Sequence, residues 1–341
     1  EEMRSFIDRL HEINEGRGPA GRVRVAGLDL YGLHASIEDI LGTLDALDPE
    51  AAAVARHRYG RLTPWQQDPS TYERAALDRS FLLREEPIVA RLKRRLGHRL
   101  ERERIGRDRF FDAVSNAHWI VEADRYYRTL YRGNAAAWNL RGQHMFETLE
   151  RLLAHHGPGS KMVVWAHNTH VGNAAATEMA ARGEPNLGQL CRARFGDSVY
   201  SIGLSTDHGT VAAAHSWGGP VGRVRIRPAL AESIEALLHD TEHEMCFLPL
   251  HHPRHPGLRH TLSAPRLERA IGEVYRPETE RASHYFHAVL PRQFHEWIWI
   301  DRTRAVRPID LHELAGAPET YPFGIGATGR LDPHGTERSR R

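Results

Sequence analysis

The chain has 341 residues, of which 40% are hydrophobic and 26% are charged, a globular composition that excludes disordered, collagen-like and fibrous proteins. Its mean hydropathy is −0.54, and its longest apolar run, residues 162–166, is far shorter than a membrane span, so we expect no membrane partner. The 46 basic and 44 acidic residues nearly cancel to a net charge of +2, which argues against a nucleic-acid partner. Two cysteines, Cys191 and Cys246, are too few for a disulfide scaffold and favour a cytoplasmic location.

The first half of the chain is predicted to be mostly helical. Apolar residues at helical spacing predict helices over 3–13 and 37–47, and an apolar run between them predicts a buried strand over 23–28. Residues 50–156 contain no convincing strand, so we expect a long helical insertion whose last helix covers 143–155. Its basic window, residues 84–107, carries an apolar stripe at four-residue spacing, which indicates an amphipathic helix with a solvated face.

Strand patterns return after residue 160. The apolar runs 161–166 and 198–204 flank an alanine-rich helical stretch over 173–182, which predicts a βαβ unit. Weaker strand patterns lie at 210–214, 245–250, 270–275 and 297–301. We therefore expect an α/β fold with a mainly parallel β-sheet flanked by many helices. It would form one domain over 1–315, followed by a flexible Gly, Pro and charge-rich tail over 316–341.

The strongest chemical signal is His167-Asn168-Thr169-His170, which follows an apolar run and enters a helix. Ligands of open parallel sheets bind beyond the carboxyl ends of the strands, so both histidines are predicted to lie at such a mouth. An imidazole exchanges a proton near neutral pH, which suits acid–base chemistry. The alternative interpretation is a buried, hydrogen-bonded histidine beside a helix-capping asparagine.

Two other predicted strand ends point to the same mouth. The strand over 23–28 leads into Asp29, whose carboxylate could orient a histidine or cap the following helix. The strand over 198–204 leads into residues 205–208, where His208-Gly209 is typical of a turn. The histidine-rich tract 251–260 contains two prolines and a glycine, which favours a loop over a metal site.

Other catalytic classes lack their motifs. The sequence contains no GxSxG nucleophile elbow, Walker loop, GxGxxG fingerprint or HExxH zinc motif. What remains is histidine and carboxylate acid–base chemistry, which we expect to be hydrolytic and to require neither a cofactor nor a metal.

In combination, several ordered motifs make the chain resemble the erythromycin esterase family, some of whose members carry a succinoglycan-biosynthesis label. The resemblance spans roughly residues 1–312. Its motifs lie at 25–36, 137–141 with His144 and Met145 after them, 164–172, 186–190, 268–272 and 275–286.

This resemblance implies an α/β fold and metal-independent hydrolysis of a macrolide lactone by water that a histidine base activates. The small-molecule ester substrate would be macrolide-like, and the reaction would inactivate an antibiotic. His167 and His170 match the two histidines of the family motif. Arg141 matches an arginine that an aspartate usually follows, whereas Gly142 follows it here. A Gly-Glu-x-x-His-Gly segment with the proposed base would precede Glu1, so we expect an N-terminally truncated chain.

Two groups of site residues are predicted on these grounds. The expected catalytic residues are His167, His170, Asp29 and Arg141, where the arginine would stabilise an oxyanion. The expected substrate-binding residues are Asn168, Arg281, His284 and Tyr285.

Three alternatives stay open at this point. The first is a non-catalytic or biosynthetic accessory protein that keeps the pocket without the base. The second is a metallohydrolase that uses His167 and His170 with Asp29. The third, nucleic-acid binding, has the least support.

Overall fold

The computed structural model describes residues 2–18, 21–30, 134–216 and 219–307, together with scattered positions between 41 and 129. The scattered positions are helical, in line with the predicted insertion. The basic window 84–107, the tail 316–341 and most of the predicted helix over 37–47 lie outside the described residues.

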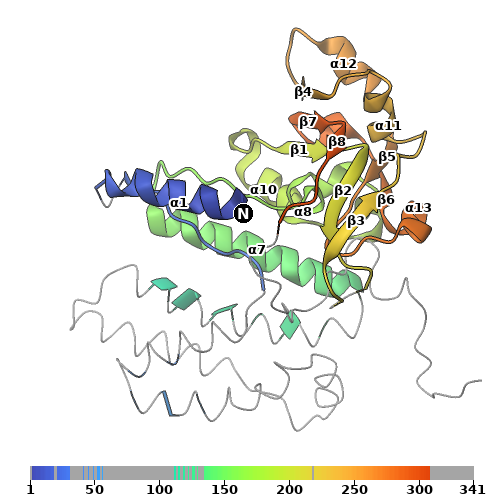
Figure 1. The fold of residues 1–341 in the computed structure, drawn as a ribbon. Coiled ribbons are helices and arrows are strands. Elements are labelled where there is room, and N and C mark those ends of the chain that lie inside the picture. Colours follow the sequence, from blue (N-terminus) through green and yellow to red (C-terminus); the bar gives the residue numbers. More distant parts are fainter. Residues whose placement is uncertain are drawn as a thin grey trace, which may run out of the picture.

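Two helices form one side of the described structure. Helix α1, Glu2–Glu15, runs beside the long helix α7, Asn134–His156 (Figure 1). Both helices were expected from their apolar spacing, and α7 begins nine residues earlier than the predicted 143. Its buried face packs against helix α10, Leu187–Phe195, through a core of Met145, Phe146, Leu149, Leu187 and Cys191.

The first sheet has the order β1-β7-β4. Strand β1, Ile202–Ser205, pairs in parallel with β7, Glu296–Ile300, and β7 pairs antiparallel with β4, Met245–Pro249. Trp297 and Trp299 of β7 are fully buried because they point into an apolar core, beside Leu250 and Phe294. All three strands overlap predicted ones.

Two further sheets contain the other strands of the described residues. One has the order β3-β2-β8, with β3 at Gly222–Ile226, β2 at His208–Ala213 and β8 at Arg302–Thr303. The other pairs β5, Arg266–Arg269, with β6, Tyr285–Ala288. Only β1·β7 and β2·β8 are parallel, so the mixture of helices and sheets is confirmed and a mainly parallel sheet is not.

The remaining elements are short. The helices are α8 at Asn168–Val171, α9 at Met179–Arg182, α11 at Ile234–His239, α12 at Pro256–Thr261, α13 at Glu280–Ser283 and α14 at Leu290–Gln293. The 3-10 turns are η4 at Ala174–Ala176, η5 at Gly196–Ser198 and η6 at Pro277–Thr279. No helix among the described residues is long and apolar enough to cross a bilayer.

Three strand predictions are wrong. Residues 23–28 and 161–166 form no strand, and residues 270–275 contribute only an isolated bridge between Val274 and Ala214. A strand requires a hydrogen-bonded neighbour, and the described neighbour of β1 is β7 rather than 161–166. Consistent with an uncovered face, Val163 and Trp165 are 92% and 78% exposed. The predicted βαβ unit is therefore absent from the described residues, and its helix over 173–182 is divided into η4 and α9.

Candidate functional site

The histidine motif begins a one-turn helix. His167 is the N-cap of α8 in an extended conformation, and its Nδ1 accepts a hydrogen bond from the Thr169 backbone N–H at 3.3 Å. The Thr169 hydroxyl also lies 2.8 Å from Nδ1, and Nε2 lies 3.1 Å from the carbonyl oxygen of Ile271. Because a carbonyl only accepts, the proton of the neutral ring belongs on Nε2 and Nδ1 accepts. Both ring nitrogens of His167 thus hold the turn in place.

Asn168 joins this turn to the sheet. Its side-chain amide donates to the Leu204 carbonyl at 2.7 Å, and its Oδ1 accepts from the Leu204 N–H at 3.2 Å. The amide therefore pairs with β1 as a neighbouring strand would. This geometry fixes α8 at the end of the sheet, and Asn168 does not line the adjacent cavity.

His170 is the buried histidine of the motif. Its ring, 7% exposed as a residue, stacks on the indole of Trp138 from α7 with centroids 4.9 Å apart and planes 17° apart. Asn186 donates to the carbonyl oxygens of Thr169 and Gly172 at 2.7 and 2.8 Å, which holds both ends of α8. The imidazole orientation is therefore set by packing on one side and by a tethered backbone on the other.

Asp29 and Arg141 form a two-point ion pair. The guanidinium Nε donates to Oδ1 at 2.8 Å and Nη2 donates to Oδ2 at 2.6 Å. The Leu30 N–H also donates to Oδ1 at 2.7 Å, and the Trp119 indole donates to the Asp29 carbonyl at 2.7 Å. The Arg141 side chain is 5% exposed and that of Asp29 is 32% exposed, so the carboxylate lies at the edge of the buried arginine.

One cavity of about 1,170 Å³ connects these groups. Its wall includes all four predicted catalytic residues: Asp29, Arg141, His167 and His170. Helix α1, the extended segments 22–29 and 160–167, and α7 supply a mostly apolar remainder, in which Phe6 packs edge-on against Trp165. A polar cluster within an apolar wall of this size is typical of a site for a small molecule.

His144 lies one turn beyond Arg141 on α7 and was not among the predicted site residues. It is 2% exposed, and burial lowers its pKa to about 4, so its imidazole is neutral at physiological pH. Its Nε2 lies 3.4 Å from the Thr148 hydroxyl, and its Nδ1 has no hydrogen-bond partner among the described residues. The three-residue spacing from Arg141, which puts both on one helix face, is the signal that could have found it.

The structure does not bring the other predicted binding residues to this cavity. His284 accepts from the Arg276 N–H at 3.0 Å and lies 3.2 Å from the Ala270 carbonyl, and burial lowers its pKa to about 4. The buried Tyr285 hydroxyl accepts from the Leu230 N–H at 3.2 Å. Arg281, with 65% of its side chain exposed, pairs with Glu232 on the surface. None of the three lines the cavity, so their role in binding substrate stays a prediction.

A metal held by His167, His170 and Asp29 does not fit this geometry. Both oxygens of Asp29 accept from Arg141, and both nitrogens of His167 are occupied, Nδ1 within the turn and Nε2 by the Ile271 carbonyl. Among the described residues, the side chains that gather closely enough to hold a metal ion lie elsewhere, around Asp207.

Comparison with known protein families shows which family this chain is similar to. A sequence model described as erythromycin esterase matches residues 1–303. The chain belongs to the erythromycin esterase family. Membership supports a hydrolase-type function and confirms the resemblance that the ordered motifs predicted.

Solved structures share the fold. A succinoglycan biosynthesis protein is 20% identical with a TM-score of 0.68, and the match covers 89% of this chain and 71% of that protein. A protein from Bacillus cereus is 18% identical with a TM-score of 0.71, covering 89% and 72%. A mutant of erythromycin esterase EreC in its open conformation is 16% identical with a TM-score of 0.58, covering 87% and 72%.

Proposed function

We propose that this chain is a carboxylic ester hydrolase of the erythromycin esterase type, which opens the lactone of a macrolide-like substrate with water. The observation that supports it most is that Asp29, Arg141, His167 and His170 line one largely apolar cavity of about 1,170 Å³. A macrolide ring is large and mostly apolar around a single ester, so it matches an apolar wall with a few polar groups. Family membership independently supports hydrolase chemistry.

The four polar residues take different roles in this proposal. His170 is the catalytic histidine: its ring is aligned by the stacked Trp138, and it polarises the ester carbonyl or holds the attacking water. His167 is a positioning residue because both of its nitrogens hold the turn. Arg141 supplies positive charge beside the developing oxyanion, and Asp29 fixes the direction of the guanidinium.

The reaction adds one water to the ester. The water oxygen bonds to the acyl carbon while its proton passes to a general base, and the carbonyl oxygen becomes the oxyanion. The carbon–oxygen bond to the alcohol then breaks, and the departing alkoxide takes a proton. The products are a carboxylate and a hydroxyl on one opened ring, so the substrate gains the mass of one water.

Gly142 does not by itself favour the non-catalytic alternative. A side chain at this position would point to the 185–186 turn, where an added Cβ would lie 3.5 Å from the Pro185 carbonyl oxygen, and the position does not line the cavity. A carboxylate here would therefore start from a face of α7 that does not line the cavity. The cysteines Cys191 and Cys246 are free thiols, which fits the proposed cytoplasmic location.

The test is hydrolysis of erythromycin followed by mass spectrometry. It would use the 341-residue chain and, in parallel, the complete reading frame that encodes it, each with a His170→Ala variant. We expect the gain of one water, and its loss in the variant. A folded protein from the complete reading frame that leaves a panel of macrolides intact would overturn the proposal and favour the accessory protein.

A further inference from the structure

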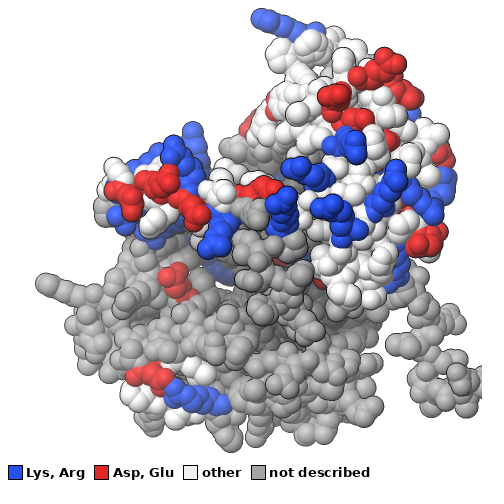
Figure 2. All heavy atoms as spheres, viewed as in Figure 1, with Lys and Arg blue, Asp and Glu red and all other residues white. Residues whose placement is uncertain are grey.

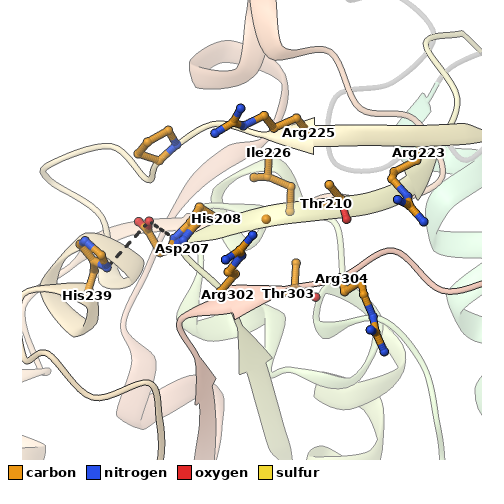
Figure 3. Close-up of a pocket in the computed structure, with 12 residues that line it drawn as sticks. Asp207, His208, Thr210, Arg223, Arg225, Ile226, His239, Arg302, Thr303 and Arg304 are labelled. Atoms are coloured by element: carbon orange, nitrogen blue, oxygen red, sulfur yellow. Dashed lines mark hydrogen bonds and ion pairs between the residues drawn. The ribbon is translucent and has the colours of Figure 1, made fainter.

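A second cluster of titratable side chains lies at the carboxyl ends of β1 and β7. Strand β1 ends at Ser205 and is followed by Asp207 and His208, and β7 ends at Ile300 and is followed by Asp301. Because these strands are parallel neighbours, their carboxyl ends lie at one edge of the sheet. His239, the last residue of α11, reaches the same point (Figure 3).

We propose that Asp207, His208, His239 and Asp301 form a binding site for a divalent transition-metal ion of the zinc class. Each offers one ligand atom, and the four atoms lie within 4.8 Å of one another. His208 Nδ1 is 2.9 Å from Asp207 Oδ2, and His239 Nδ1 is 2.6 Å from Asp301 Oδ1. The two crossed nitrogen–oxygen distances are 3.9 and 4.0 Å.

These distances suit a small tetrahedral ion. Zinc binds imidazole nitrogen and carboxylate oxygen at about 2.0–2.2 Å, which places neighbouring ligand atoms of a tetrahedron about 3.4 Å apart. The four measured separations lie on both sides of that value. Small rotations of the two histidines, whose side chains are 36% and 50% exposed, would therefore complete the geometry.

The carboxylates are held in position by the surrounding structure. The Asp207 side chain is 4% exposed, and its Oδ1 accepts from the Ala229 N–H at 2.9 Å, which leaves Oδ2 facing the histidines. The Asp301 carbonyl accepts from the N–H groups of Asp207 and His208, both at 3.1 Å. The buried Arg269 donates to the carbonyls of Thr206 and Asp207. Such outer hydrogen bonds are what fix the ligands of protein metal sites.

The charge of the cluster and the chemistry of its ligands together indicate which ion it would bind. With both imidazoles neutral, the cluster carries two negative charges, and no lysine or arginine among the described residues pairs with either carboxylate. Four arginines line the same pocket of about 1,100 Å³ (Figure 3). Arg223 and Arg225 belong to β3, Arg302 belongs to β8, and Arg304 follows β8. Figure 2 shows basic side chains over the face where β2 and β3 lie in Figure 1. These arginines repel every divalent cation alike, so the preference comes from the ligands: two imidazole nitrogens suit zinc, whereas Mg²⁺ and Ca²⁺ prefer oxygen ligands.

The competing arrangement is two protonated histidines, each paired with one aspartate. The experiment that separates the two is titration of the chelator-treated 341-residue chain with ZnCl₂ alone, measured by competition with a chromophoric chelator. Because the tract around His252 and His255 can also take zinc, the titration is done in the His252→Ala/His255→Ala background. We expect one zinc per chain, and no comparable binding of MgCl₂.

Variants then locate the ion. Removing the half-exposed ring in His239→Ala, or one charge in Asp207→Asn, should weaken zinc binding at least tenfold, with folding checked by circular dichroism. The matched control is His287→Ala, since His287 pairs with a single carboxylate, Glu178, at 3.1 Å and should bind no metal. Unchanged zinc affinity in His239→Ala, or no zinc bound by the parent chain at micromolar concentrations, would overturn the proposal.

Discussion

Asp29 and Arg141 are 112 residues apart in the sequence, and their side chains meet in two parallel hydrogen bonds of 2.8 and 2.6 Å. The pair joins the end of the extended segment 22–29 to helix α7. Because the Arg141 side chain is 5% exposed, the Asp29 carboxylate compensates a charge that water hardly reaches. The same contact therefore contributes to stability and sets the charge at the cavity wall.

Asp29→Asn should therefore lower both stability and turnover. The neutral amide accepts hydrogen bonds less strongly and removes a negative charge from beside the buried guanidinium, which should cost about 1.5–3 kcal/mol in the free energy of unfolding. Urea denaturation of the two proteins measures this difference. Arg141→Lys keeps the charge and loses the two-point geometry, so we expect an intermediate loss. Equal stability of parent and Asp29→Asn would contradict this account of the pair.

Removing the His170 imidazole should reduce kcat/KM for macrolide hydrolysis about 10²–10³-fold, the usual cost of losing one group that polarises the reacting carbonyl. Trp138→Leu removes the stacked ring and leaves His170 present, so we expect a smaller loss with a changed pH profile. His260→Ala, an exposed position outside the cavity, is the control and should keep full activity. A His170→Ala protein with parental kcat/KM would remove His170 from the reaction.

Two buried histidines, His144 and His284, and the partly buried His295 should make the chain less stable in mild acid. Burial lowers the pKa of His144, His284 and His295 to about 4, from about 6.5 in the unfolded chain. Between those values the unfolded chain binds protons that the folded chain does not, so the free energy of unfolding falls as pH decreases from 6.5 to 4. Urea titrations at pH 7.5, 6.0 and 5.0 measure the slope. His295→Gln should reduce it, and a slope that did not change would contradict the burial argument.

Glu268 predicts the opposite trend with pH. It is fully buried, and burial together with the nearby Glu235 raises the pKa of its carboxyl well above 4.5. Above the unfolded pKa the unfolded chain is ionised while the folded chain keeps the proton, so this group costs stability as pH rises. Glu268→Gln keeps the shape without the ionisable proton and should be more stabilising at pH 8 than at pH 5. A larger benefit at pH 5 would disprove this ionisation scheme.

Gly188 marks the closest approach of α10 to the histidine turn. A Cβ built at this position would lie 2.2 Å from the carbonyl oxygen of Val171 and 2.4 Å from that of Gly172, both backbone atoms. Gly188→Ala should therefore move α8 and destabilise the chain by about 3 kcal/mol or more. Gly257→Ala is the matched control, because nothing lies within 4 Å of its added Cβ. Comparing the thermal midpoints of both variants tests this packing.

Local periodicity was sufficient to predict α1, α7 and the strands β1, β4 and β7, each of which has an apolar pattern of its own. Periodicity wrongly predicted strands over 23–28 and 161–166, where the apolar residues suit a strand but no segment among the described residues pairs with them. Whether an extended segment finds a neighbour is a property of the whole fold, and no window of sequence contains it.

For the site residues too, part of the arrangement could be predicted from local sequence, and part depends on the whole fold. His170 and Asp29 were predicted to lie at one site because each follows an apolar run. Both line the same cavity, although neither run forms a strand. The pairing of Asp29 with Arg141 spans the helical insertion and could not be read from spacing. His208-Gly209 resembled an ordinary turn because the partners of Asp207 and His208 are distant in the sequence. Asp301 follows β7, the parallel neighbour of β1, and His239 is the last residue of α11.

The hydrogen bonds of His167 indicate that the two histidines of the motif differ in how well they tolerate substitution. At position 167 the turn requires one acceptor facing the Thr169 N–H and one donor facing the Ile271 carbonyl, and asparagine or glutamine can offer both. At position 170 the proposed chemistry requires an imidazole that stacks on Trp138 and polarises the ester carbonyl or holds the attacking water. A library randomised at both positions and selected for macrolide resistance should thus return several residues at 167 and histidine alone at 170.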